Sequence, residues 1–93
     1  MQLLIFPDYT KRFRVSTDAS CVGLGAILSQ MDDNDNDRVV AYASRSLPQA
    51  EKNYHTTERE LLAVVWALDR FRPYIYNTEF DLITDHEPLV RIS

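Results

Sequence analysis

The spacing of apolar residues changes along this chain from strand-like to helical and then back to strand-like, and this order restricts the possible folds more than any other feature. Apolar and polar residues alternate over Arg12–Asp18, which predicts a half-buried strand. Further strands are predicted over Val22–Gln30 and Arg38–Arg45, on either side of an Asp- and Asn-rich turn at Met31–Asp37. Three strands joined in this way are typical of an antiparallel meander.

A helix is predicted after the meander, because apolar residues there recur at helical spacing. Thr56 and Thr57 are both acceptable N-caps, so we expect the helix to start beside them. Its apolar stripe is predicted to centre near Leu61 and Val65, and Pro73 predicts a kink or an end.

The remaining segments complete one small domain. Alternation over Glu79–Asp85 predicts a fourth strand, and Glu87–Ile92 could begin a second helix. An apolar run that ends in a Pro-Asp turn signal lies within residues 1–10, which we interpret as a connection or edge segment. With 93 residues in all, the chain has room for one hydrophobic core, which we place in a domain over residues 11–93.

Charge and cysteine content argue against several functional classes. The formal net charge is −4, and strong free-standing binding to nucleic acid is not expected because Lys and Arg supply most of that affinity. Cys21 is the only cysteine, so no intramolecular disulfide can form, in agreement with a reducing compartment. We find no membrane span or secretory signal, and we therefore expect an intracellular protein, in the cytoplasm or the nucleus, with no membrane partner.

Three carboxylates on separate predicted elements are the main candidates for chemistry. Asp18 and Asp85 each lie where a predicted strand ends, a common place for functional residues, although either could simply cap a turn. Glu60 lies near the start of the predicted helix, where it could form a capping box with Thr57. On a helical wheel Glu58 and Glu60 flank the predicted stripe on opposite sides, so the periodicity does not choose between them.

Convergence of these acids would imply a bound metal. Three carboxylates in one place repel one another unless divalent cations neutralise them. Mg²⁺ is the expected ion, because it prefers oxygen ligands and retains bound water. Such a site suits phosphodiester hydrolysis, in which one ion activates a water and a second ion stabilises the leaving oxygen.

Other metal and nucleophile motifs are not supported. The acidic tract Asp32–Asp37 lacks the Gly and Glu that a calcium-binding loop needs at its sixth and twelfth positions, so a solvated hairpin turn is predicted there. His55 and His86 form no recognised zinc spacing with Cys21. No serine lies in a Gly-x-Ser-x-Gly motif, which argues against a serine hydrolase.

Seven short motifs occur in a definite order along the chain. They are Phe13–Ser20, Gly23–Gln30, Ala41–Leu47, Glu51–Tyr54, Thr57–Leu68, Phe71–Tyr74 and Thr84–His86. Each is weak alone, but together they strongly resemble the ribonuclease H domain of gypsy-type LTR retrotransposon polyproteins. The resemblance runs from about Leu3 to Leu89, and Phe6–Asp8 resembles the short connection between the polymerase part and the nuclease.

This resemblance implies an α/β fold with a mixed sheet, in which a three-strand antiparallel meander is followed by a helix and a parallel fourth strand. It also implies that Asp18, Glu60 and Asp85 are catalytic residues that bind two Mg²⁺ ions, or Mn²⁺ in their place. The implied reaction is endonucleolytic cleavage of the RNA strand of an RNA–DNA hybrid, leaving a 3′ hydroxyl and a 5′ phosphate. The implied partners are the hybrid and the polymerase and connection domains of the same polyprotein.

One departure from the family pattern leaves a second hypothesis open. Family members carry a further acidic residue, a last strand and additional helices after the segment that matches Leu89, so we expect the fold here to be C-terminally truncated. Such a truncation exposes apolar surface and sheet edges. The alternative is therefore a non-catalytic or domesticated remnant that serves as a structural or interaction module.

Overall fold

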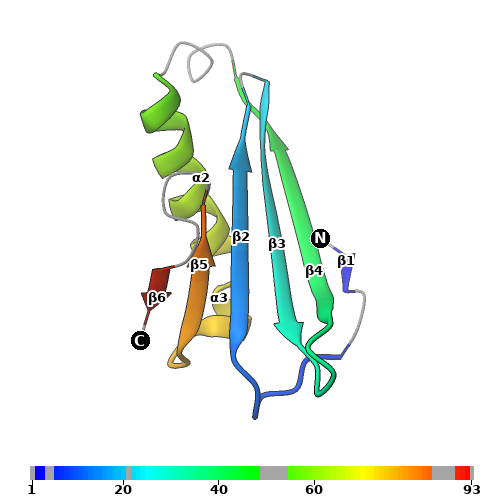
Figure 1. The fold of residues 1–93 in the computed structure, drawn as a ribbon. Helices are drawn as coiled ribbons and strands as arrows, with labels where there is room; N and C mark the ends of the chain where they lie inside the picture. Colours follow the sequence, from blue (N-terminus) through cyan, green and yellow to red (C-terminus); the bar gives the residue numbers. More distant parts are fainter. Residues whose placement is uncertain (1, 4–5, 21, 49–54, 85–89, 93) are drawn as a thin grey trace.

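A computed structural model of the chain describes residues 2–3, 6–20, 22–48, 55–84 and 90–92. Within them, helices cover one face of a single sheet (Figure 1). The strands are β1 (Gln2–Leu3), β2 (Phe13–Ala19), β3 (Gly23–Met31), β4 (Asp37–Ser46), β5 (Phe80–Ile83) and β6 (Val90–Ile92). The helices are α2 (Thr56–Arg70) and α3 (Arg72–Ile75). Neither of these helices is both long enough and apolar enough to span a membrane.

The described strands form a sheet in the order β1-β4-β3-β2-β5-β6. Its three longest strands make the predicted antiparallel meander, with Asp18 beside Gly25 and Gly25 beside Ser44. β5 pairs in parallel with β2, so that Ile83 lies beside Ser16. This arrangement confirms the predicted mixed sheet with a parallel fourth strand.

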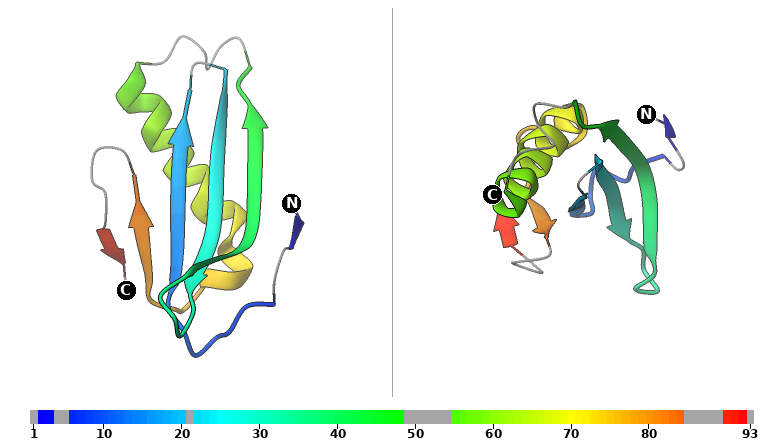
Figure 2. Two further views of the ribbon diagram at one scale, coloured as in Figure 1. Left: turned by 45° about the vertical axis from the view of Figure 1, so that its right-hand side comes forward. Right: turned by 90° about the horizontal axis from the view of Figure 1, so that it is seen from above.

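The core lies between α2 and the covered face of the sheet, as the view from above shows (Figure 2). Its main cluster consists of Phe13, Val15, Ala26, Leu28, Val40, Ala41, Ala43, Ala67, Phe71, Ile75, Phe80 and Leu82. Burial alternates along β2, because the side chains of Phe13 and Val15 enter this core whereas Asp18 is exposed. Asp18 therefore lies on the opposite face of the sheet, which no described helix covers (Figure 2).

The start of α2 is close to the predicted position, but its cap differs from the predicted one. His55 is the N-cap, and its backbone N–H donates a hydrogen bond to Oε1 of Glu58 at 3.2 Å. The capping box therefore joins His55 and Glu58, and not Thr57 and Glu60, which the sequence offers as an alternative. The helix begins at Thr56, which places Glu58 three residues after the cap.

The face of α2 that packs on the sheet also differs from the prediction. Leu61 and Val65 are 61% and 66% exposed, so the apolar stripe centred on them is wrong. The buried positions of the helix are Ala63 and Ala67, followed by Phe71 at its C-cap. Small alanine side chains let the helix backbone approach β2 and β3 closely, which close packing of the core favours.

Short strands occupy both edges of the described sheet. Val90–Ile92 forms β6, antiparallel to β5. The second helix predicted over Glu87–Ile92 is therefore wrong for these last three residues, and positions 87–89 lie outside the described residues. Pairing with β5 satisfies backbone groups that its outer side would otherwise leave open. At the other edge Gln2–Leu3 pairs with β4, in agreement with the predicted edge segment.

The Asp and Asn tract between β3 and β4 forms a hairpin turn, as predicted. Oδ1 of Asp32 accepts hydrogen bonds from the backbone N–H groups of Asn34 and Asn36, at 2.8 and 2.9 Å. Asp35 adopts a positive φ of 63°, which this residue type tolerates in turns. The backbone hydrogen bond from Asn36 is the main cause of a lowered pKa of Asp32. This carboxylate therefore serves as an acceptor for the backbone of the turn.

Candidate metal centre

Asp18 lies near the end of β2, on the uncovered face of the sheet. A hollow of about 380 Å³ lies beside it. The side chains around this hollow include Ser16, Asp18, Ile27, Tyr42 and Ser44. An exposed carboxylate at the edge of such a hollow is accessible to a ligand from solvent.

The floor of this hollow is open because β3 carries glycine at position 25. Gly25 lies between Asp18 on β2 and Ser44 on β4. A Cβ at Gly25 would meet no atom within 4 Å, and the backbone there has no positive φ. At Gly23, in contrast, an added Cβ would lie 2.9 Å from the carbonyl oxygen of Arg45. Neither packing nor conformation requires Gly25, and a glycine inside a strand often marks a place where another group approaches closely.

Glu60 is positioned by α2, which packs against the strand that carries Asp18. Its side chain is half-buried, and its Oε2 oxygen is buried. Glu58 is exposed in the first turn and bonds to the backbone of the N-cap. The structure therefore gives the capping role to Glu58, and Glu60 remains the candidate ligand.

Asp85, the third predicted site residue, lies outside the described residues, as does His86. The strand before it, β5, runs parallel to β2 and places Ile83 beside Ser16. The described end of β5 and Asp18 consequently lie toward the same end of these two parallel strands. In the part of the chain that the structure describes, which excludes position 85, no three His, Cys, Asp or Glu side chains are grouped so that they could hold a metal ion.

The donor chemistry of Asp18 and Glu60 fits a hard divalent cation. Both are carboxylates, the ligands that Mg²⁺ prefers in proteins. Partial burial shields the Glu60 carboxylate from some of the surrounding water, and a bound cation would compensate for this lost hydration. Asp18 is open to solvent, so an ion bound there could keep some of its water ligands.

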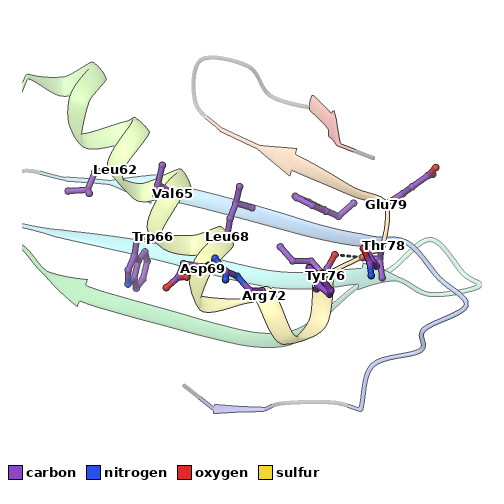
Figure 3. A pocket seen from close by; sticks show the side chains of 12 residues that line it. Leu62, Val65, Trp66, Leu68, Asp69, Arg72, Tyr76, Thr78 and Glu79 are labelled. Carbon is purple, nitrogen blue, oxygen red and sulfur yellow. Dashed lines mark hydrogen bonds and ion pairs between the residues drawn. The ribbon is translucent and has the colours of Figure 1, made fainter.

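A larger hollow of about 940 Å³ is lined by residues of α2, α3 and the start of β5 (Figure 3). Its lining is mostly apolar and includes Leu62, Val65, Trp66, Leu68 and Tyr76. Neither Asp18 nor Glu60 lines it. Its charged groups include Asp69 and Arg72, which form an ion pair at 3.1 Å. The larger volume therefore does not coincide with the candidate chemistry.

Tyr42 and Ser44 are two residues of the smaller hollow that the sequence reasoning did not single out. Both are exposed on β4, whereas Ala41 and Ala43 between and beside them are buried. This alternation is the signal that could have placed them on the same face as Asp18.

Comparisons with known proteins agree with the resemblance seen in the motifs. Residues 8–93 match the model of a family described as the RNase H-like domain found in reverse transcriptase. The chain is 49% identical over 89 residues to the retrovirus-related Pol polyprotein from transposon opus of Drosophila melanogaster. It is 47% identical over 88 residues to the corresponding polyprotein from transposon gypsy of the same organism. It is also 38% identical over 85 residues to the transposon Tf2-3 polyprotein of Schizosaccharomyces pombe.

These matches cover most of this chain but little of each relative. They include 95%, 94% and 89% of the chain, against 9%, 8% and 6% of the three polyproteins. The chain thus spans less than a tenth of the length of these relatives. Its sheet, with a meander and a parallel fourth strand, agrees with the same assignment. The chain belongs to the family of RNase H-like domains found in reverse transcriptases.

Proposed function

We propose that this domain is a metal-dependent endonuclease that cleaves the RNA strand of RNA–DNA hybrids, as part of a retrotransposon reverse transcriptase polyprotein. The observation that carries the proposal is the position of Asp18. This carboxylate is exposed beside a hollow. It lies near the C-terminal end of β2, and the neighbouring parallel strand β5 runs toward the same end. Membership of the RNase H-like family supports the same reaction class.

Asp18, Glu60 and Asp85 are the proposed ligands and catalytic residues. Two Mg²⁺ ions held by them would supply an activated water and neutralise charge on the leaving oxygen, and Mn²⁺ suits the same oxygen donors. Asp18 contributes its carboxylate on the solvent side, where a nucleic acid can approach the open face of the sheet. Glu60 contributes a carboxylate whose Oε2 is buried, from the helix that packs against the sheet.

The negative charge of the chain bears on how the hybrid is held. With a formal net charge of −4, the domain has little affinity of its own for a phosphate backbone. Hybrid binding is therefore expected to depend on divalent ions and on other parts of the polyprotein. The polymerase and connection domains are the proposed partners that supply this additional surface.

The test compares Mg²⁺-dependent cleavage of a labelled RNA–DNA hybrid by the wild type and by Asp18→Asn, which keeps the shape and removes the charge. We expect cleavage to fall by at least about a hundredfold, because a metal ligand is lost. Asp69→Asn is the matched control, since it removes the same charge from an exposed position in the larger hollow. Calorimetric titration with Mg²⁺ provides a readout besides activity, and we expect weaker binding in Asp18→Asn alone.

Two outcomes would contradict the proposal in different ways. Equal cleavage by the wild type and Asp18→Asn would show that Asp18 is not part of the site. Absence of cleavage in every variant, with Mg²⁺ still bound by the wild type, would favour the non-catalytic module over the nuclease.

A further inference from the structure

Gln30 is a buried polar residue that the proposed reaction does not use. It lies near the end of β3, beside Phe13 of β2, and only 3% of its surface is exposed. A buried amide is costly unless its donors and acceptor are hydrogen-bonded. The partners of Gln30 therefore indicate what the residue does.

The amide of Gln30 bonds to the backbone of the turn at residues 8–11. Its Oε1 accepts a hydrogen bond from the backbone N–H of Asp8 at 2.9 Å. Its Nε2 donates to the carbonyl oxygens of Asp8 and Lys11, at 2.7 and 3.2 Å. Both amide hydrogens and the amide oxygen are thus used, and one side chain holds both ends of the turn.

The turn is also stabilised by its own contacts. The backbone N–H of Lys11 donates to the carbonyl oxygen of Asp8 at 3.0 Å. The backbone N–H and the hydroxyl of Thr10 donate to Oδ1 of Asp8, at 3.0 and 2.6 Å, and these bonds lower the pKa of Asp8. Tyr9 packs edge-on against Phe13, with ring centroids 5.7 Å apart. A preformed turn fastened to two strands does not behave as a flexible linker.

The chain ahead of this turn is fastened to the same sheet. β1 pairs with β4, where Leu3 lies beside Ala41. Figure 1 shows β1 at the edge of the sheet beyond β4, with β6 at the opposite edge. Contacts to the sheet therefore hold the chain at Gln2–Leu3 and again at the turn that leads into β2.

We propose that Gln30 is a positioning residue that fixes the direction in which the preceding polypeptide meets the nuclease sheet. This inference rests on the proposed function, in which a polymerase part of the same polyprotein precedes the domain. A rigid junction holds the polymerase and nuclease sites at a constant separation along one bound hybrid. Gln30 thereby limits the variation in the distance between each RNA cut and the growing 3′ end of the DNA.

The test uses the polyprotein with its polymerase and nuclease parts joined. Gln30→Ala removes all the bonds to the turn, whereas Gln30→Glu keeps the size but cannot donate to the carbonyls of Asp8 and Lys11. Thr78→Val is the matched control, because it removes another part-buried hydrogen bond, 2.8 Å long, to the carbonyl of Ile75.

Primer extension on an end-labelled RNA template measures the distance from each RNA cut to the DNA 3′ end. We expect one narrow distribution for the wild type and Thr78→Val, and a broader one for both Gln30 variants. Cleavage of a free hybrid by the same polyprotein, measured without primer extension, is expected to stay at the wild-type rate. Hydrogen–deuterium exchange at the Asp8 amide should be about tenfold faster in Gln30→Ala, because this amide loses its partner.

The outcomes separate this inference from the proposed function. A broader distribution together with faster exchange at Asp8 supports the role of Gln30. An unchanged distribution in Gln30→Ala, when exchange shows that the turn is released, overturns it while cleavage itself persists. If Gln30→Ala does not fold, the cut distribution and the exchange at Asp8 are measured in Gln30→Glu, and the same outcomes support or overturn the inference. A polyprotein that cleaves no hybrid at all overturns the proposed function and this inference with it.

Discussion

Replacing Phe71 tests which face of α2 holds the domain together. Phe71 is 0% exposed and belongs to the main core cluster. Truncation of a buried Phe to Ala costs about 3–5 kcal/mol of the free energy of unfolding. A domain of 93 residues has about 5–14 kcal/mol in total, so Phe71→Ala is expected to leave the fold marginal. Phe71→Leu keeps most of the volume, and we expect it to cost only about 1–2 kcal/mol.

Leu61→Ala is the control, because the sequence pattern predicts a buried Leu61 whereas the structure shows this side chain exposed. Full burial of a Leu side chain contributes about 1.5–3 kcal/mol. Since Leu61 is 61% exposed, only about four-tenths of that contribution applies, and its truncation should cost less than about 1 kcal/mol.

The assay is urea unfolding followed by the fluorescence of Trp66, the only tryptophan in the chain. Trp66 is partly buried against the core, so its emission should report on packing of α2. With about 1–3 kcal/mol per molar urea, a loss of about 1–2 kcal/mol in Phe71→Leu should lower the midpoint by roughly 0.3–2 M. A loss of stability in Leu61→Ala as large as that in Phe71→Leu would show that the assigned helix face is incorrect.

Two further predictions concern the glycines of β3 and the Asp-rich turn. Gly23→Ala should cost about 1–3 kcal/mol, because its Cβ would lie 2.9 Å from the backbone oxygen of Arg45. Gly25→Ala, whose Cβ meets nothing within 4 Å, should be neutral or stabilise the fold by up to about 1 kcal/mol, while it slows hybrid cleavage. Urea unfolding in which Gly25→Ala is less stable than Gly23→Ala would contradict this prediction. The pKa of Asp32 is lowered from 3.8, mainly by the backbone N–H of Asn36, so its ionised form stabilises the fold above pH 3.8 and this contribution is lost as the pH falls below it. The stability of Asp32→Asn should therefore depend less on pH below 3.8 than that of the wild type. The same loss of stability on acidification in both proteins would refute a stabilising role for ionised Asp32.

The meander and the parallel strand could be predicted from the sequence because each strand buries one face. Alternation located β2 and β5, and the composition on either side of the Asp- and Asn-rich turn located β3 and β4, all to within two residues at every end. The strand at Val90–Ile92 could not be found in this way, since three residues are too few to show a period. Its conformation depends on pairing with β5, which the local sequence does not encode.

The candidate site could be predicted only in part. The order of motifs selected Asp18, Glu60 and Asp85 through resemblance, and the structure describes the first two of these positions. Gln30 carried no sequence signal, because its hydrogen-bond partners lie 22 and 19 residues away in the chain. Contacts of this kind depend on the tertiary fold and leave no local pattern.

The face of α2 was mispredicted for a similar physical reason. Hydropathy gives weight to large side chains, so Leu61 and Val65 dominate the periodic signal. Close packing of a helix on a sheet favours small residues at the points of contact, and Ala63 and Ala67 fill those positions here. The exposed Leu61 and Val65 thus lie on the outer side of the helix.

The correct helix face also distinguishes the two glutamates that the sequence left unresolved. At about 100° per residue, Glu60 lies roughly 20° from Ala67 and 60° from Ala63 around the helix axis, on the side that meets the sheet. Glu58 lies about 140–180° from the same alanines, on the solvent side, where it can fold back to the cap. The buried Oε2 of Glu60 agrees with this geometry. Because α2 packs on the sheet, its geometry turns Glu60 rather than Glu58 toward the sheet, and this distinction follows from two alanines rather than from either acid.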